Sequence, residues 1–286
     1  MKFVKPKDSM NSTVPMISAQ TLNLGVDLEI VHASLWQAGA NADQMGCWAD
    51  DLGSVELLSL TLEKGASSVL QSQPEDFEKD LKAWINLREN PSGYFQNPLT
   101  SILPNGTDFE KHSIEDVKDK DRLRTAITSY CESRGNQPCQ EYVNAIFEEL
   151  YMNAMLDAPR EAGGKKANKF VSFYLGCDER RIAIVCEDQY GSLKMTKLLA
   201  RMKDVYERGA GDAIDLRGPG GAGLGCVIML EKSSLLCIGV VPQQITTVAA
   251  LVPRHTSFRK RTDQKKSIHL VEKVTDQSQL KKIKPA

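Results

Sequence analysis

The sequence predicts an α+β chain whose second half forms a largely antiparallel sheet. Strand-like apolar segments there occur in consecutive pairs joined by short turns, and amphipathic helical segments separate the pairs. A smaller mixed α/β region precedes them. With 286 residues, 41% of them hydrophobic, the chain is long enough to build two domains with separate cores.

Composition divides the chain into four segments. Residues 1–13 are polar and charged and predict a flexible tail, and residues 14–125 predict an N-terminal regulatory or interaction domain. Residues 126–255 form the second domain, and residues 256–286 a basic C-terminal tail. A solvated terminus is favoured for this tail over contact with RNA, an acidic partner or a neighbouring nucleotide-binding domain.

In the N-terminal region, short apolar runs alternate with helical patterns. Strands are expected at residues 14–17 and 55–60, and helices at residues 77–87 and 121–133. The charged stretch 110–121 follows two prolines, which predicts loops or a linker. Two interpretations of this domain remain open, a degenerate receiver or an unrelated interaction domain, because no acidic pair follows the first apolar run.

From Cys139 onward the periodicity is sharper. Val143, Ile146, Phe147 and Leu150 recur at helical spacing, and Pro159 is expected to end that helix. The following segments predict a hairpin, a helix that stops at Gly209, a helix after the glycine-rich run, and two further strands. Their ranges are 169–175 and 181–186 for the hairpin, 195–206 and 227–230 for the helices, and 235–241 and 245–252 for the last strands.

A polar stripe runs along the first of these helices. Glu149, Asn153 and Asp157 are spaced i, i+4 and i+8, so they lie on one face. Carboxylate and amide oxygens suit Mg²⁺, whose coordination is usually completed by phosphates and water. A solvated helix face is the alternative, and Glu148 fits that description better.

Asp188 follows a buried strand directly and precedes the turn-like segment 189–193. A carboxylate at a strand end can accept a hydrogen bond from the exocyclic amine of a base. It can equally initiate a turn through its own backbone.

Five glycines lie within the eight residues 218–225, directly before an apolar helix. Glycine persists where a side chain would block close approach of a ligand, and helix N-termini favour anions such as phosphate. A dinucleotide-binding fingerprint is excluded because charged residues, not a buried strand, precede the run. A flexible connector remains the alternative.

Three separated elements together resemble the histidine-kinase-like (GHKL) ATPases. Residues 149–154 resemble the N box of that family, Asp188 with Gly191 the first glycine box, and residues 220–225 the second. The resemblance covers roughly residues 138–255. It implies a two-layer α/β sandwich of the Bergerat type that binds ATP and Mg²⁺, with the segment between Ser192 and Gly220 as a lid.

The resemblance also implies roles for single residues. Glu149 is the candidate general base, Asn153 the magnesium ligand, and Asp188 with Gly191 the contact to adenine. Thr246 supplies a hydroxyl beside Asp188, although Thr247 competes for that place. The phosphates are assigned to Gly220, Gly221, Gly223, Leu224 and Gly225.

This chain departs from the family pattern at two places. The usual first glycine box has two glycines after the aspartate, but here Asp188 is followed by Gln189-Tyr190-Gly191-Ser192, and larger residues occupy both expected glycine positions. In addition, Leu156 replaces a basic residue that is often found near the end of the N box. Tyr190 is expected to stack on the base or to close the pocket. The variant resembles a bacterial subgroup of stand-alone or receiver-linked signalling ATPases.

Two functions are compatible with these residues. The first is a serine/threonine protein kinase of anti-sigma type, and the second a nucleotide-dependent binding module without catalysis. A third, a DNA-dependent ATPase of the gyrase B type, lacks support, because no transducer domain is expected after residue 255. Histidine autophosphorylation is disfavoured, because His32, His112, His255 and His269 lack the context of a phosphoacceptor.

Composition limits the cellular setting and the partners. The net charge of −1 gives no indication of nucleic acid binding, and no apolar run is long enough to cross a membrane. Seven cysteines without a C-x-x-C pair predict reduced structural thiols. We therefore expect a cytoplasmic protein with a protein partner in a signalling pathway, and a homodimer is compatible with this assignment.

Overall fold

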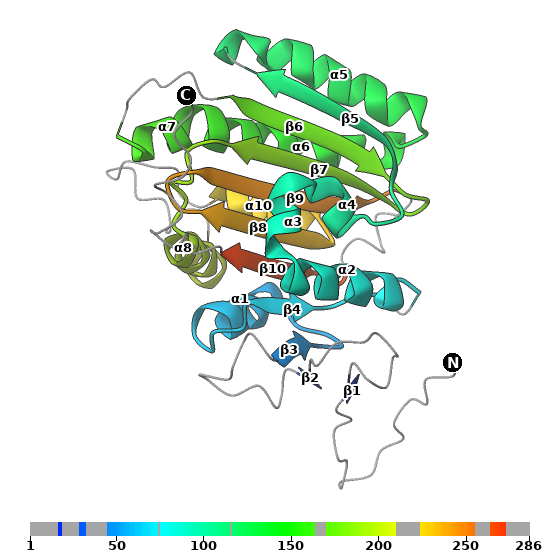
Figure 1. Cartoon of the computed structure of the whole chain (residues 1–286), viewed down its shortest axis with the longest axis vertical. Helices are drawn as coiled ribbons and strands as arrows, with labels where there is room; N and C mark the ends of the chain where they lie inside the picture. Colours follow the sequence, from blue (N-terminus) through cyan, green and yellow to red (C-terminus); the bar gives the residue numbers. More distant parts are fainter. Residues whose placement is uncertain are drawn as a thin grey trace, which may run out of the picture.

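The described strands form one open, mixed sheet with helices packed against it (Figure 1). The computed structural model describes residues 17–18, 29–32, 45–73, 75–114, 116–163, 170–209, 224–254 and 264–272. Within these residues the sheet has ten strands in the order β1-β2-β3-β4-β10-β8-β9-β7-β6-β5. The fold is therefore mixed α/β.

The strands come from both halves of the chain. They are β1 (Ile17–Ser18), β2 (Glu29–His32), β3 (Met45–Trp48), β4 (Ser68–Leu70), β5 (Thr107–Ile114), β6 (Val171–Cys177), β7 (Arg181–Asp188), β8 (Leu235–Val241), β9 (Ile245–Pro253) and β10 (Ser267–Glu272). The strands β5, β6, β7, β9 and β8 pair antiparallel in that spatial order. In contrast, β10 pairs parallel with β8 and antiparallel with β4, while β2, β3 and β4 pair parallel.

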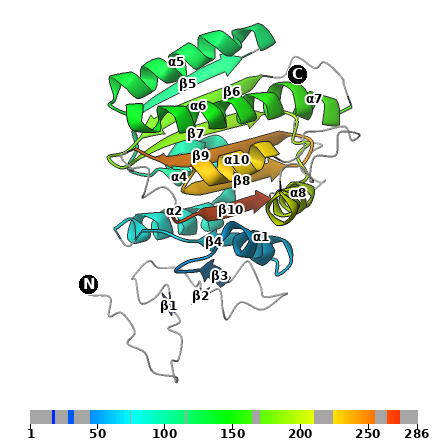
Figure 2. The ribbon, with the colours of Figure 1, turned by 180° about the vertical axis from the view of Figure 1, so that it is seen from behind.

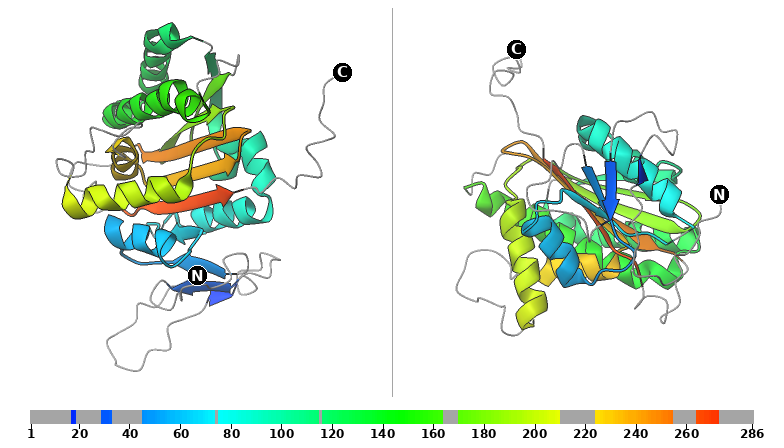
Figure 3. Two further views of the ribbon diagram at one scale, coloured as in Figure 1. Left: turned by 90° about the vertical axis from the view of Figure 1, so that its left-hand side faces the viewer. Right: turned by 90° about the horizontal axis from the view of Figure 1, so that it is seen from below.

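Helices cover both faces of this sheet, as the two opposite views (Figures 1 and 2) and the edge-on view (Figure 3) show. One face carries α1 (Ser54–Leu62), α5 (Lys120–Ser133), α6 (Gln137–Met152), α8 (Met195–Arg208) and α10 (Leu224–Lys232). The other face carries α2 (Phe77–Glu89), α3 (Pro91–Gln96) and α4 (Pro98–Ile102). A π-helical turn (Asn153–Asp157) and α7 (Ala158–Glu161) extend α6, and a 3-10 turn (Val117–Asp119) precedes α5.

Each face has its own hydrophobic core. The larger core joins α1, α5, α6, α8 and α10 to the sheet, and fully buried Phe147 and Phe173 contact each other edge to face, with ring centroids 5.4 Å apart. On the opposite face, Tyr94 is fully buried and its hydroxyl donates to the Cys237 carbonyl at 3.2 Å. Both strand faces are thus removed from water, which explains why the central strands are almost continuously apolar.

Most elements after residue 120 lie where the sequence predicted them. The hairpin β6–β7, the helices α6, α8 and α10, and the pair β8–β9 are all confirmed. In the N-terminal region, α2 and α5 also match their predictions. All seven cysteines are buried thiols that form no disulfide, as expected for structural cysteines.

Two predictions in the N-terminal region were wrong. Residues 55–60 form part of α1 rather than a strand, because Leu57, Leu58 and Thr61 cluster on one helical face and leucine and glutamate favour helices. Residues 110–114 belong to β5 rather than to a linker. This strand lies at the edge of the sheet, where charged side chains face water and hide the usual alternation.

Two predictions near the ends of the second domain also need correction. The solvated tail expected from residue 256 includes β10, whose Ile268 is fully buried between β4 and β8. Pro159 does not end the helix, because the chain widens into the π-helical turn and continues as α7 with the proline in its first turn. Proline is tolerated there, since its missing N–H has no helical partner anyway.

Strands from both sides of residue 125 share this sheet, and the domain boundary itself stays a prediction. In the part of the chain that the structure describes, none of the helices has the length and apolar character needed to span a membrane.

Candidate functional site

A cavity of about 380 Å³ lies at the junction between α6 and the π-helical turn. The ends of β7 and β9 and the helices α8 and α10 form its other walls. Its floor is apolar and includes Ile238 and Val248. The polar side chains on its wall are Glu149, Asn153, Asp157, Glu161, Asp188, Ser192, Arg201 and Thr246. Apolar walls with a few convergent polar groups are typical of small-molecule sites.

The helical side of the cavity is shaped by the π-helical turn. The Ala158 N–H donates to the Asn153 carbonyl five residues back, so the backbone widens between these residues. Glu149, Asn153 and Asp157 all line the cavity, which confirms that the predicted stripe shares one face. π-helical turns of this kind occur frequently at functional sites.

The two neighbouring glutamates of α6 have different surroundings. Glu148 is paired with Lys120 at 2.6 Å and with Arg124 at 2.5 Å. Burial alone would raise the pKa of Glu148, but the two cations together lower it below its ordinary value. Burial raises the pKa of Glu149, with a further contribution from the Glu148 carboxylate. A carboxylate with a raised pKa, aimed into a cavity, is suited to accept a proton.

On the sheet side, Asp188 and Thr246 are directly opposite each other in the β7–β9 ladder. Both are buried, and one Asp188 oxygen accepts from the Tyr190 N–H at 2.8 Å. The Thr246 hydroxyl has no hydrogen-bond partner among the described residues. A buried hydroxyl without a partner costs about 1–3 kcal/mol, so this pair is prepared for a ligand with complementary polar atoms.

Thr247 was the competing candidate for this position. It does not line the cavity, whereas Thr246 does. Its carbonyl instead accepts from the Tyr94 hydroxyl at 3.3 Å in the core of the opposite face. Successive strand residues point to opposite faces, which separates the two threonines.

No protein-family model matches this sequence, and comparison with curated proteins finds no relative of significant similarity.

The remaining predicted site residues lie in several places. Gly225 lines the cavity at the start of α10. Leu224, the first residue of α10, is half-buried against the larger core. Gly220, Gly221 and Gly223 lie outside the described residues.

Gly191 lines a neighbouring cavity of about 720 Å³, together with Tyr190, and not the cavity that contains Asp188. Its φ is +55°, and a Cβ there would lie 2.5 Å from the Gln244 nitrogen. Its carbonyl accepts from the Gln243 N–H at 3.0 Å. Gly191 thus allows the loop after β7 to pack on the β8–β9 turn, and Tyr190 does not reach the cavity of Asp188.

Sequence reasoning did not assign several lining residues to the site, among them Leu198 and Arg201 of α8 and Glu161 of α7. Leu198 and Arg201 are three residues apart and therefore share a helix face, a signal that could have placed them together. Glu161 could not be found, because it depends on the helix continuing past Pro159.

Within the described residues, no group of three or more histidine, cysteine, aspartate or glutamate side chains is arranged to hold a metal ion. A Mg²⁺ ion at Asn153 would therefore need further oxygen ligands. Phosphates and water usually provide these.

Proposed function

We propose that this protein binds Mg-ATP in the cavity between α6, β7, β9 and α10, and that it serves as a signalling protein. The observation that carries this proposal is the meeting of Asp188 and Thr246 with Glu149 and Asn153 in one cavity of about 380 Å³. These residues lie between positions 149 and 246 of the sequence, and three of them belong to segments that resemble boxes of the histidine-kinase-like ATPases.

The residues fit adenine at one end of the cavity. The Asp188 carboxylate can accept a hydrogen bond from the exocyclic amine, and the buried Thr246 hydroxyl beside it supplies a donor and an acceptor. The apolar side chains of Ile238 and Val248 would contact the ring faces. A carboxylate acceptor favours adenine over guanine, which presents a carbonyl oxygen at the equivalent position.

The fold proposal concerns residues 126–255. There α6, α8 and α10 pack on one face of β6, β7, β9 and β8, which is compatible with a two-layer Bergerat-type arrangement. The helices α3 and α4, which cover the opposite face, come from outside this segment. We propose that the N-terminal region acts as a regulatory or interaction unit, with the receiver and the unrelated domain both open.

For catalysis, we assign the proton-accepting role to Glu149 and the metal-binding role to Asn153. Bound Mg-ATP supplies the phosphoryl group and the metal charge that neutralises it. The raised pKa of Glu149 makes it a better base toward a serine or threonine hydroxyl than an exposed glutamate would be. Cations near the phosphates stabilise developing negative charge, and Arg201 is the cationic side chain on the described wall.

The second candidate is a binding module that uses ATP without turnover. It is favoured by the placement of Gly191 and Tyr190 outside the cavity, because the loop of the first glycine box is then occupied in packing against the β8–β9 turn. In this case the nucleotide would stabilise one arrangement of α8 and so alter a surface for a protein partner.

Calorimetric titration tests the nucleotide site. ATP with Mg²⁺ should bind the wild-type protein more tightly than GTP does, and Asp188→Asn should lose at least about tenfold in ATP affinity. Asparagine keeps an oxygen for the Tyr190 N–H, so the fold should be retained. Asp121→Asn, at an exposed position of α5, is the matched control. Unchanged ATP affinity in Asp188→Asn would contradict the adenine assignment.

Phosphate transfer from labelled ATP separates the two functions. A kinase should label a partner protein, and Glu149→Gln should abolish labelling while leaving ATP affinity within about threefold. If the wild-type protein binds ATP and transfers no phosphate to any partner or to water, the binding module is the correct function.

A further inference from the structure

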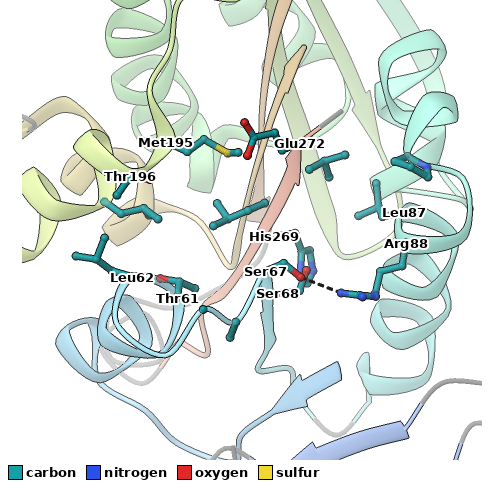
Figure 4. A pocket seen from close by; sticks show the side chains of 16 residues that line it. Thr61, Leu62, Ser67, Ser68, Leu87, Arg88, Met195, Thr196, His269 and Glu272 are labelled. Carbon is teal, nitrogen blue, oxygen red and sulfur yellow. Dashed lines mark hydrogen bonds between the residues drawn. The ribbon is translucent and has the colours of Figure 1, made fainter. Parts of the chain in front are cut away.

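A second cavity, of about 360 Å³, lies where the N-terminal strands join the rest of the sheet (Figure 4). It is bounded by β4, β10, the end of α1, the last turn of α2 and the first turn of α8. It shares no lining residue with the cavity of Asp188. Helix α8 separates the two, with Leu198 lining one and Leu199 the other.

Polar groups gather at one end of this cavity. Figure 4 shows Ser67, Ser68, Arg88 and His269 close together, and Met195 and Glu272 away from them. The Arg88 guanidinium donates to the Ser67 hydroxyl at 2.9 Å, which fixes its position at the cavity wall. Ser68 and His269 are paired residues in the β4–β10 ladder.

His269 is the unusual member of this group. It is 1% exposed and its ring stacks on Trp84, with centroids 6.3 Å apart and planes 9° from parallel. Neither ring nitrogen makes a hydrogen bond of normal geometry with the described residues, although the Ile268 backbone lies close enough to oppose the pKa shift in part. Burial, with a contribution from Arg88, lowers the pKa of His269 to about 3, so the ring is neutral and presents one donor and one acceptor.

An imidazole buried without partners is costly, and native structures usually satisfy such groups. A ligand with a hydrogen-bond acceptor at this end would satisfy the ring and meet Arg88 at the same time. The rest of the cavity wall is mixed: it includes the apolar side chains of Leu62, Met195 and Leu199, and the polar side chains of Thr61, Thr196 and Glu272. The occupant should therefore combine a small acceptor group with an apolar body.

We propose that this cavity binds a small organic monocarboxylate, whose carboxylate contacts Arg88 and His269 and whose apolar part lies against Leu62, Met195 and Leu199. A guanidinium binds a carboxylate through parallel hydrogen bonds. A phosphate dianion is disfavoured, because the cavity has one cation on its described wall and also contains the Glu272 carboxylate.

Thermal unfolding and NMR of nitrogen-15 labelled histidine test this site in the full chain without nucleotide. The probes are sodium acetate, butyrate, 4-methylpentanoate and phenylacetate, each compared with its neutral amide, with inorganic phosphate and with sodium chloride of equal ionic strength. At least one of the three larger carboxylates should raise Tm with a Kd below about 10 mM. The same carboxylate should also shift the nitrogen-15 NMR resonances of the His269 ring, and its neutral amide should bind at least about tenfold more weakly.

Arg88→Gln should weaken binding of that carboxylate at least about tenfold, whereas Lys82→Gln, an exposed position on the same helix, should leave it unchanged. The proposal is wrong if no carboxylate binds, if phosphate or the amide binds equally well, or if Arg88→Gln retains full affinity. Nucleotide is absent throughout, so this result and that for the ATP site are independent.

Discussion

The carboxyl group of Glu149 lies against the α-carbon of Gly225, so that a Cβ at residue 225 would stand 2.9 Å from the Glu149 Cδ and closer still to one carboxylate oxygen. The two residues belong to α6 and α10, whose contact closes one side of the candidate nucleotide cavity. Glycine at this position therefore sets the place of the proposed general base.

Gly225→Ala should move this carboxylate without unfolding the protein. The side chain of Glu149 can rotate away, and alanine in a helix gains about 0.5–1 kcal/mol over glycine, so the free energy of unfolding should change little. A more exposed carboxylate should have a pKa closer to its ordinary value. Carbon-13 NMR titration of the carboxyl groups should show a lower pKa for Glu149 in the variant, with ATP turnover reduced at least about tenfold. An unchanged pKa with unchanged turnover would contradict this relationship.

The two threonines of β9 give a matched pair for the adenine end of the cavity. Thr246→Val removes a buried hydroxyl without a partner among the described residues, so stability should be kept or slightly raised. If the hydroxyl contacts adenine, ATP affinity should fall about three- to tenfold, the value of one neutral hydrogen bond. Thr247→Val makes the same chemical change on the opposite face and should leave affinity unchanged. Equal losses in both variants would show an indirect effect, and no loss in either would exclude the contact.

Much of the fold could be predicted because its core-facing residues repeat at regular intervals. In α6, Val143, Ile146, Phe147 and Leu150 are all buried, and their spacing alone identifies the helix. Edge and tail elements could not be found in this way. Charged residues of β5 face water at the sheet edge, and β10 depends on partners almost 200 residues earlier in the chain.

The candidate site was predictable where local spacing determines the geometry. Glu149 and Asn153 share a face by helical periodicity, and Asp188 ends a buried strand. The register that places Thr246 rather than Thr247 opposite Asp188 comes from long-range pairing, which one sequence does not encode locally. The separate location of Gly191 likewise follows from contact with the β8–β9 turn.

A buried ion pair fastens α2 to the hairpin β6–β7. Arg181 contacts the Asp80 carboxylate and also donates to Asp178 at 3.3 Å, and all three side chains are largely buried. Asp80→Ala leaves the Arg181 charge with less compensation, so the free energy of unfolding should fall by about 3 kcal/mol. Urea denaturation measures this loss. Glu78→Ala, on the same helix with an exposed pair to Lys82, should be unchanged within error, and equal effects of the two variants would argue against a role for burial.

His269 should make the protein sensitive to mild acid. Its pKa is about 3 in the folded protein, against an ordinary value of 6.5, so the unfolded chain binds the proton more readily. The contribution of the neutral His269 ring to the free energy of unfolding is therefore complete above pH 6.5, and it falls as pH decreases toward 3. Between pH 7 and pH 5 this group alone should lower the free energy of unfolding by about 2 kcal/mol.

His269→Phe keeps an aromatic ring for stacking on Trp84 and cannot take up a proton. Urea denaturation at pH 7 and pH 5 measures how far the free energy of unfolding falls between the two values. This fall should be smaller by about 2 kcal/mol in His269→Phe than in the wild-type protein. His112→Gln is the control, because it removes a different histidine and retains the buried imidazole of His269. If the free energy of unfolding falls between pH 7 and pH 5 by the same amount in His269→Phe and in this control, His269 is not neutral when buried.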